Sequence, residues 1–398
     1  MLDIILIGSG PSSLFTLLYL NTYFPNLKLG IICQNLNKFH CTYGIFLSQI
    51  EKSWIFNLIN KNHFFSKIFE MEFRFNNKKI DLPDKYGLMN NDFVFDFIIN
   101  KIKNVKIILG TCNDIQNFEN HKIVYYYQEG IQNSILTKFV IEGIGYCKPI
   151  GLEYTFPNTF YKQVFVGYKI KIEHTQEKVI LMDWKPKNYE IKSFCYTVPL
   201  DKDKLLVEET ILVCKELLPK YYDILEERLK DRLKIYEYEI LEIEKNTIIL
   251  NSSIPKFNSK SFGIGQVGNM MNVMSGYSVG YNIYHIPEIC NLIIRNNFDT
   301  KQAYLNYWDF KKRNIFKINY AGIEMLDNLN QLETGEFLFY YFKEIVLKSF
   351  YQHKIIFLNC SNEFELGKFF ESCIYYFNLP KKYLGMIVYY SMKRFLLF

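Results

Sequence analysis

The first thirty residues carry a clear change of hydrophobic pattern. Residues 2–7 are an apolar run of strand type, broken by a Gly-Ser-Gly turn and followed by an apolar, helix-compatible segment at 12–20. Residues 28–33 form a second apolar run, so the pattern predicts a strand, a tight turn, a helix and a second strand. This order is typical of a dinucleotide-binding unit, in which the turn and the start of the helix bind a pyrophosphate.

The glycine loop predicts which residues contact the nucleotide. The first glycine makes the turn, the second lets the backbone approach the pyrophosphate, and Ser13 is small enough to keep helix and sheet close. Gln34 stands where an acidic residue normally binds the ribose, and its amide accepts a hydrogen bond without carrying a charge. The alternative is a tight turn that binds nothing. With the later glycines, the predicted cofactor-binding residues are Gly8, Gly10, Pro11, Ser12, Ser13, Gln34, Gly145, Gly265, Gly268 and Gly276.

Strand and helix patterns alternate along the rest of the chain. A hairpin is predicted near 69–82, with Asn76 and Asn77 at its turn. An amphipathic helix is predicted at about 220–235, and we interpret its charged residues as a solvated face. The last hundred residues are helical and aromatic in pattern, without glycine-rich turns.

These patterns predict a mixed α/β (α+β) fold. A chain of 398 residues is too long for one simple core, so two or three lobes are expected. We predict a nucleotide-binding domain at 1–150, whose hairpin near 69–82 joins the second lobe. A strand-rich domain follows at 151–254, then a return to the first domain at 255–298, and a helical region at 299–398.

Composition and charge narrow the functional classes. The net charge is only +6 and no basic run alternates with aromatics, so we expect no nucleic-acid partner. Nine scattered cysteines without a CxxC pair, and six histidines without ligand spacing, favour free thiols in a reducing compartment and no metal site. No apolar run reaches the roughly 18 to 20 residues that span a bilayer, and no signal or transit peptide is seen. We therefore expect a cytosolic or peripheral protein.

Two adjacent glutamates in a predicted strand are the first candidates for chemistry. Neighbouring side chains in a strand face opposite sides, so one of Glu208 and Glu209 points into the lobe. An acid on the apolar side has a raised pKa, stays protonated near neutrality and is a candidate general acid. The alternative is an edge strand on which both are partly exposed and salt-bridged. Asp183, which precedes Trp184 at the end of another apolar strand, is the third candidate acid.

Six short motifs occur in a fixed order along the chain. They are the GxGPxx loop, Thr42-Tyr43-Gly44, Met182-Asp183-Trp184, Phe194-x-Tyr196-x-x-Pro-Leu, Glu208-Glu209-Thr210 and a glycine-rich run that ends Ser275-Gly276-Tyr277. This order resembles the flavin-dependent lycopene cyclase family, whose members close the end rings of linear carotenoids. The resemblance is collinear over about the first 300 residues and continues weakly to the end, where residues 333–337 resemble an acidic-aromatic stretch of the family's helical tail. The chain departs from the family pattern at Phe46, where Trp is usual, and at 272–275.

The resemblance implies an FAD-binding fold of the hydroxylase type, interleaved with an antiparallel substrate sheet. It also implies chemistry that uses reduced FAD without net redox change, with NAD(P)H as the electron source. By resemblance the Glu208-Glu209 pair supplies the proton that starts ring closure, while Asp183 orients the acid or offsets the carbocation. The substrate cavity is then walled by Trp184, Phe194, Tyr196 and Tyr277. A base removes a ring-adjacent proton, and the carbon that loses it decides between a β- and an ε-ring.

A carotenoid substrate lies in the bilayer, so the resemblance implies peripheral membrane contact. Residues 381–398 mix basic and aromatic side chains as interfacial helices do, and the alternative is a buried terminal helix with basic ends. We expect the protein on the cytoplasmic side of a membrane. A plastid is the alternative, although the targeting segment that it would need is not seen.

Two other functions stay open at the level of the sequence. One is an FAD-dependent hydroxylase or epoxidase of a lipophilic substrate, although such enzymes usually keep a Gly-Asp pair where residues 263–268 have no Asp. The other is a diverged, non-catalytic protein that binds flavin or an isoprenoid.

Overall fold

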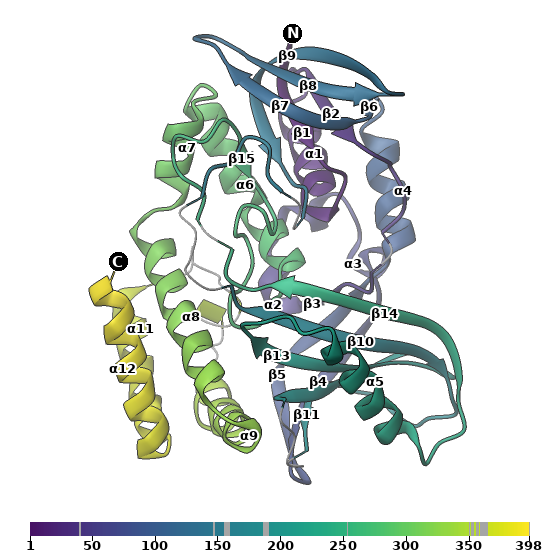
Figure 1. Ribbon diagram of the computed structural model, residues 1–398, viewed down its shortest axis with the longest axis vertical. Helices are drawn as coiled ribbons and strands as arrows, with labels where there is room; N and C mark the ends of the chain where they lie inside the picture. Colours follow the sequence, from purple (N-terminus) through teal and green to yellow (C-terminus); the bar gives the residue numbers. More distant parts are fainter. Residues whose placement is uncertain are drawn as a thin grey trace.

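The hydrophobic N-terminal segment forms the centre of a seven-stranded sheet (Figure 1). The computed structural model describes all of the chain except residues 40, 146–147, 155–159, 186–190, 253, 350, 352–353, 356–357, 359–364 and 398. The first sheet runs in the order β6 (Lys106–Leu109), β2 (Leu29–Cys33), β1 (Leu2–Ile7), β9 (Ile131–Glu142), β8 (Lys122–Gln128) and β7 (Thr111–Asn117), with β15 (Phe262–Gly263) paired to β9.

The two faces of this sheet are covered differently. Strands β6, β2, β1, β9 and β15 pair in parallel. The central strands β1 and β2 are buried on both sides, as parallel strands usually are, whereas the edge strand β6 exposes Ile107 and Leu109. One face packs against α1 (Pro11–Tyr23), α4 (Asn91–Lys101) and α6 (Val279–Arg295). The other face packs against the antiparallel strands β7 and β8, which curl over it. Helix α7 (Thr300–Tyr307) follows α6 in the same layer.

A second sheet of eight strands lies beside the first (Figure 1). Every pair in it is antiparallel except β4 with β11, which run parallel. Its order is β14 (Glu239–Ile249), β10 (Lys162–Lys171), β13 (Lys204–Cys214), β12 (Ser193–Asp201), β11 (Val179–Trp184), β4 (Phe65–Phe75), β5 (Lys78–Met89) and β3 (Gly44–Phe46).

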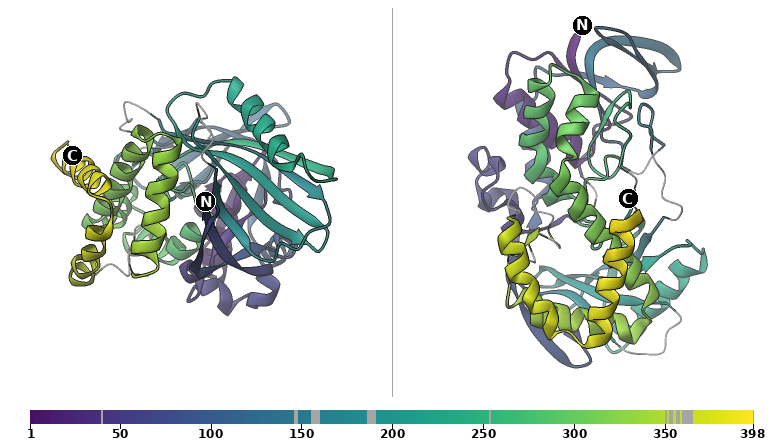
Figure 2. Two further views of the ribbon diagram at one scale, coloured as in Figure 1. Left: turned by 90° about the horizontal axis from the view of Figure 1, so that it is seen from below. Right: turned by 90° about the vertical axis from the view of Figure 1, so that its left-hand side faces the viewer.

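Helices cover both faces of the second sheet. Helix α5 (Lys220–Leu233) packs against one face through its leucines, Leu225, Leu229 and Leu233. The other face packs against α8 (Phe310–Asn328), α9 (Gln331–Tyr340) and the π-helical turn η2 (Tyr341–Val346). Figure 2 shows α5 and the C-terminal helices on opposite sides of this sheet.

The remaining helices are short or lie at the C-terminal end. Helix α12 runs along α8, and it is the last element of the chain (Figure 2). These elements are α2 (Leu47–Ile50), η1 (Trp54–Asn57), α3 (Lys61–Phe64), α11 (Leu366–Cys373), η5 (Ile374–Asn378) and α12 (Lys381–Leu397).

Local sequence signals explain where several elements begin and turn. The N-terminal strand, turn and helix are confirmed, and Pro11 occupies the first turn of α1. The predicted hairpin turn is confirmed as well, since Asn76 and Asn77 both adopt positive φ between β4 and β5. Helix α9 begins with a capping box, in which Asn330 and Glu333 exchange side-chain-to-backbone hydrogen bonds. The mixed α/β fold class is confirmed, whereas the division into domains at 150, 254 and 298 stays a prediction.

The turn at Gly8 predicts a measurable difference between two glycines of positive φ. Gly8 has a φ of 98°, and a Cβ built there would lie 2.6 Å from the carbonyl oxygen of Gly143. Gly130 has a φ of 80° with nothing within 4 Å. We expect Gly130→Ala to lower the free energy of unfolding by about 1–2 kcal/mol, which is the cost of placing a residue with a Cβ in the left-handed backbone conformation. Gly8→Ala should cost clearly more, about 3 kcal/mol or above, because backbone must also move. Urea denaturation measures both, and equal losses would contradict this account of the loop.

Candidate active site

The glycine loop after β1 has the geometry of an anion-binding helix start. Gly10 is the N-cap residue of α1, with no side chain capping the helix and no acidic residue in its first turn. A Cβ built on Gly10 would find its nearest atom 3.9 Å away, so the space in front of the helix is open. The hydroxyl of the buried Ser13 donates to the carbonyl oxygen of Gly143 at 3.3 Å, which ties the helix to the end of β9. Free N–H groups, an open approach and a helix dipole together fit a pyrophosphate.

Of the later predicted glycines, two lie in or near the glycine loop and one lies at the second sheet. Gly265 lies against the loop, because a Cβ built there would be 2.8 Å from Ser12 Oγ. Its N–H donates to Asn282 Oδ1 at 2.9 Å. Gly268 packs on the backbone of Gly263 a few residues away. Gly276 is elsewhere: it has a φ of 77° and faces Gln163 of the second sheet.

Two predicted contacts lie at the outer parts of this site. The side chain of Gln34, which follows β2, is exposed and donates to Thr111 Oγ1 at 3.4 Å. Gly145 has a φ of 66° and open space around it. The cofactor role of all ten residues stays a prediction, which the geometry of the loop supports at Gly8, Gly10, Ser12 and Gly265.

Residues 272–275 depart from the family pattern, and the side chain of Asn272 forms a turn at this place. Its Oδ1 accepts hydrogen bonds from the N–H groups of Met274 and Ser275, each at 2.9 Å, and from Ser275 Oγ at 3.0 Å. The N–H of Gly276 donates to the carbonyl oxygen of Asn272 at 2.8 Å. This Asx-type turn directs Tyr277 toward the second sheet.

Strand β13 separates the two adjacent glutamates. The strand lies between β10 and β12, so the edge-strand alternative is wrong. Glu209 is 1% exposed and faces α5, where its Oε2 is 2.6 Å from Arg232 Nε. Ser193 Oγ donates to Glu209 Oε1 at 2.5 Å. Glu208 faces the other side of the sheet, as the alternation of a strand requires.

Asp183 belongs to the network of Glu209. Its Oδ2 is 3.2 Å from Arg232 Nη1, so a single guanidinium binds both carboxylates on the α5 face. Arg228 of the same helix is also buried and donates to the carbonyl oxygen of Ile191 at 2.8 Å. The interpretation of the helix charges as a solvated face is therefore wrong for these two arginines, which point at the sheet to satisfy buried acceptors.

Glu208 lies among tyrosines on the opposite face. Burial raises its pKa to about 7; the charge of Glu244 adds to this, while the hydrogen bond from Thr210 opposes it. Thr210 Oγ1 donates to Glu208 Oε1 at 2.5 Å. The phenols of Tyr86 and Tyr196 are 3.0 Å apart, and the charge of Glu208 contributes to a raised pKa in both, chiefly an effect of burial. An acid in this setting is neutral for part of the time near pH 7 and can donate a proton.

Aromatic rings enclose the same face. Tyr277 reaches it from the Asn272 turn, and its ring lies 4.8 Å from Phe46 and 6.1 Å from Tyr86 in edge-on geometry. Trp184 and Phe194 share this face with Glu208, with ring centroids 5.5 Å apart. The structure therefore brings the four predicted wall residues to the face of Glu208 and leaves Asp183 and Glu209 on the other.

Three residues of this region were missed from the sequence: Tyr86, Arg232 and Glu244. Tyr86 comes from the far strand of the predicted hairpin, and no motif marks it. Arg232 is one of several charged residues on an amphipathic helix, and its spacing does not distinguish it from the exposed ones. Glu244 lies in a strand with several other glutamates, most of whose side chains are exposed, so the sequence does not distinguish it from them.

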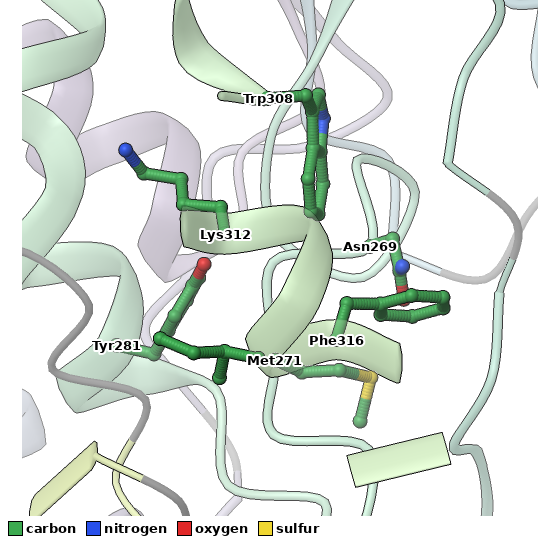
Figure 3. A pocket seen from close by; sticks show the side chains of 7 residues that line it. Asn269, Met271, Tyr281, Trp308, Lys312 and Phe316 are labelled. Atoms are coloured by element: carbon green, nitrogen blue, oxygen red, sulfur yellow. The ribbon is translucent and has the colours of Figure 1, made fainter. Parts of the chain in front are cut away.

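Two cavities lie outside this cluster. One, of about 10 Å³, is lined by residues from α6, α8 and the glycine-rich run, and Figure 3 shows these side chains. It is about large enough for one water molecule, and the buried Asn269 Nδ2 and Trp308 Nε1 at its wall have no hydrogen-bond partner among the described residues. The other, of about 60 Å³, is apolar and lies between α8, α9 and α12. Among the described residues no cluster of three or more His, Cys, Asp or Glu is placed to bind a metal.

The fold is that of the flavin-dependent monooxygenases and reductases. A structure described as a geranylgeranyl bacteriochlorophyll reductase-like protein of Thermoplasma acidophilum superposes with a TM-score of 0.69 at 11% identity, covering 94% of this chain and 95% of that one. The p-nitrophenol 4-monooxygenase of Pseudomonas putida superposes with a TM-score of 0.63 at 14% identity, covering 87% and 97%.

Sequence comparison assigns the family within this class. The family described as "Lycopene cyclase protein" matches residues 3–369, so the chain belongs to the lycopene cyclase family. The capsanthin/capsorubin synthase of Capsicum annuum, described as chromoplastic, is 22% identical over 82% of this chain and 69% of its own length. The chloroplastic lycopene beta cyclase of Solanum lycopersicum is 22% identical over 85% and 71%. The resemblance inferred from the motifs is confirmed.

The ion network on the α5 face predicts that losing Arg232 lowers the free energy of unfolding strongly, and that a second substitution at Glu209 restores much of it. Arg232→Met removes the guanidinium that binds Glu209, while Glu209 stays buried. Breaking a buried ion pair in this way costs about 3–5 kcal/mol, which urea denaturation should detect. The double variant with Glu209→Gln removes the uncompensated charge and should recover a large part of the loss. If the double variant is less stable than Arg232→Met, the stabilising role assigned to this pair is wrong.

Proposed function

We propose that this protein is a carotenoid cyclase that closes the end ring of a linear carotenoid such as lycopene. The reaction is initiated by a proton and is redox-neutral. The observation that carries the proposal is Glu208, a half-buried acid with a raised pKa on a tyrosine-lined face, in a chain of the lycopene cyclase family. Protonation of a terminal carbon–carbon double bond needs a neutral acid in a dry pocket, and burial of Glu208 favours the neutral form.

We assign Glu208 as the proton donor. Its O–H bond breaks, a C–H bond forms at the end of the polyene, and a tertiary carbocation results. A neighbouring double bond attacks this cation to close the ring, and a base then removes a ring-adjacent proton, so the product is an isomer of the substrate. The faces of Tyr86, Tyr196 and Tyr277 stabilise the cation. Glu209 and Asp183 are assigned a supporting role, because Arg232 binds both on the opposite face.

We assign the glycine loop as the binding site of the cofactor. Gly8, Gly10 and Ser12, with Gly265 against them, would hold the pyrophosphate of FAD at the start of α1. When bound, reduced FAD supplies negative charge that stabilises a carbocation without net electron transfer, and NAD(P)H is the proposed source of its electrons.

The enzyme must reach a substrate dissolved in a bilayer. None of the helices in the described part of the chain is both long and apolar enough to cross one. Helix α12 carries exposed apolar side chains at Val388, Tyr389 and Met392, next to Lys393. We propose that α12 rests on an anionic membrane surface. The compartment is the cytoplasm or, as described for the plant relatives, a plastid.

Substitution of Glu208 tests the chemistry. Glu208→Gln should reduce ring formation by about 10²–10⁴-fold, the usual contribution of a general acid, while flavin stays bound. The assay is expression in lycopene-accumulating bacteria and chromatography of the pigments, which also reports the ring type. Glu209→Gln is the control and should retain turnover if it folds. Ring formation by Glu208→Gln at the wild-type rate would overturn the assignment, and unchanged lycopene with folded, flavin-loaded wild type would overturn the function.

The pH dependence tests the same group. Turnover should fall as pH rises through about 7, because Glu208 then loses the proton that it must donate. Thr210→Val removes a hydrogen bond that favours the ionised form, so it should raise the pKa of Glu208 and move this fall to higher pH. A fall that does not move in Thr210→Val would show that another group controls it.

Membrane contact has its own test. The double substitution Tyr389→Glu and Met392→Glu places negative charge on the exposed side of α12 and should reduce cosedimentation with phosphatidylglycerol-containing vesicles about tenfold. Ile131→Glu, at an exposed apolar site on the first lobe, is the control and should bind as the wild type does. Equal binding by all three proteins would remove α12 from the membrane role.

A further inference from the structure

A second carboxyl group faces Glu208 across a glycine. Strand β10 lies between β13 and β14, and its Gly167 is paired with Glu208 on one side and with Glu244 on the other. Directly paired residues of antiparallel strands present their side chains on the same face. Neighbouring strands are about 4.8 Å apart, so the Cα atoms of the two glutamates are about 10 Å apart.

Gly167 leaves the space between the two glutamates free of a β10 side chain. A Cβ built on Gly167 would lie 3.3 Å from Cδ1 of Leu206 and 3.5 Å from both Cβ and Cγ of Glu208, so both of these β13 side chains lean over this glycine. The charge of Glu244 acts on Glu208, as expected of two carboxyl groups that share one small region. The geometry suits a water molecule that bridges the two carboxyl groups.

Glu244 also connects this region to solvent. Its side chain is 16% exposed and is bound by Lys169 Nζ at 2.7 Å. The same ammonium binds Glu242 at 2.9 Å, and the side chain of Glu242 is 53% exposed. Thr42 of the first lobe donates to Glu244 Oε1 at 3.2 Å, so the first residue of the Thr42-Tyr43-Gly44 motif binds this carboxylate.

Charged and titratable groups from several elements face the pair of carboxyl groups. The groups that act on Glu208 come from β5, β12, β13, β14 and the Asn272 turn. Those that act on Glu244 come from β10, β12, β13, β14 and the loop before β3. They are Tyr86, Tyr196, Thr210, Tyr277 and Glu244 for the first, and Lys169, Tyr196, Glu242, Cys41, Thr42, Tyr43 and Glu208 for the second.

We propose that Glu244 returns a proton to Glu208 after each cyclisation, through a water molecule held above Gly167. This inference rests on the proposed function. Glu208 becomes a carboxylate when its O–H proton passes to the substrate. Glu244, a carboxylate bound by Lys169 in the resting state, then accepts a proton from solvent beside Glu242. The bridging water accepts this proton from Glu244 and donates one to Glu208, so both carboxyl groups return to their starting forms. The ring-adjacent proton returns to solvent through the base that removes it, so protons balance over one turnover.

Substitution of Glu244 separates this role from a structural one. Glu244→Gln removes both the relay and the negative charge beside Glu208. We expect turnover at neutral pH to fall about tenfold, with KM unchanged. The fall in turnover with rising pH should also begin at lower pH, because Glu208 loses a like charge. Glu242→Gln is the matched control: it lies two residues away on β14 and shares Lys169, but it is not paired with Gly167. A pH profile of Glu244→Gln that coincides with that of Glu242→Gln would overturn the proposal.

A second variant distinguishes the relay from the charge. Gly167→Ala places a methyl group between the two carboxyl groups and leaves both charges present. Its turnover should fall about as far as in Glu244→Gln, with a larger solvent deuterium isotope effect and an unshifted pH profile. Wild-type turnover in Gly167→Ala would show that no water-mediated transfer crosses this position.

An activity-free measurement keeps this proposal separate from the cyclase assignment. Infrared difference titration of wild type against Glu208→Gln isolates the protonated-carboxyl band of Glu208, and the same subtraction in the Glu244→Gln background should titrate at lower pH. If wild type forms no rings and this shift is present, the function is wrong and the pairing stands. If rings form and the band does not shift, the pairing is wrong and the function stands.

Discussion

The two-residue period of one interior strand is the constraint on which the candidate site depends. Glu208 and Glu209 are neighbours in the sequence, yet β13 is covered on both faces, so the two carboxyl groups lie in different environments. One meets an arginine and forms a buried ion network, and the other meets phenols and a threonine hydroxyl. A slip of one residue in the register of β13 would exchange these environments and would place each acid where its partners are absent.

The network on the α5 face supports the chemistry on the other face. Arg232 binds both β11 and β13 through Asp183 and Glu209, and Arg228 binds the segment that precedes β12. The strands that carry Trp184, Phe194, Tyr196 and Glu208 are therefore held together from the opposite face. Such a network is costly to desolvate, and its value here is positional: it fixes strands whose opposite side chains form the candidate site.

The first lobe completes the site with segments from distant parts of the chain. The Asn272 turn brings Tyr277 to the second sheet, and Thr42 binds Glu244 on the edge strand. The same lobe holds the glycine loop at the start of α1, where the proposed cofactor binds, whereas the acid lies on β13 of the second sheet. This arrangement suits chemistry in which a bound cofactor and a proton donor act on one substrate.

The sequence by itself determined the local elements and the family. The strand, turn and helix at the N-terminus, the hairpin at Asn76 and the amphipathic helix α5 follow from short-range patterns of hydrophobicity and from turn chemistry, which act within a few residues. The motifs around Trp184, Glu208 and Tyr277 were enough to assign the lycopene cyclase family.

Only the tertiary structure decided which side chains meet. It placed β13 in the interior of a sheet, turned Arg232 inward from a helix that looks solvated, and aligned Glu244 with Glu208 across Gly167. These are contacts between strands and helices far apart in the chain, and their register depends on how whole elements pack. A pattern confined to one segment specifies which face of that segment is buried, but it carries no information about the partner that covers the face.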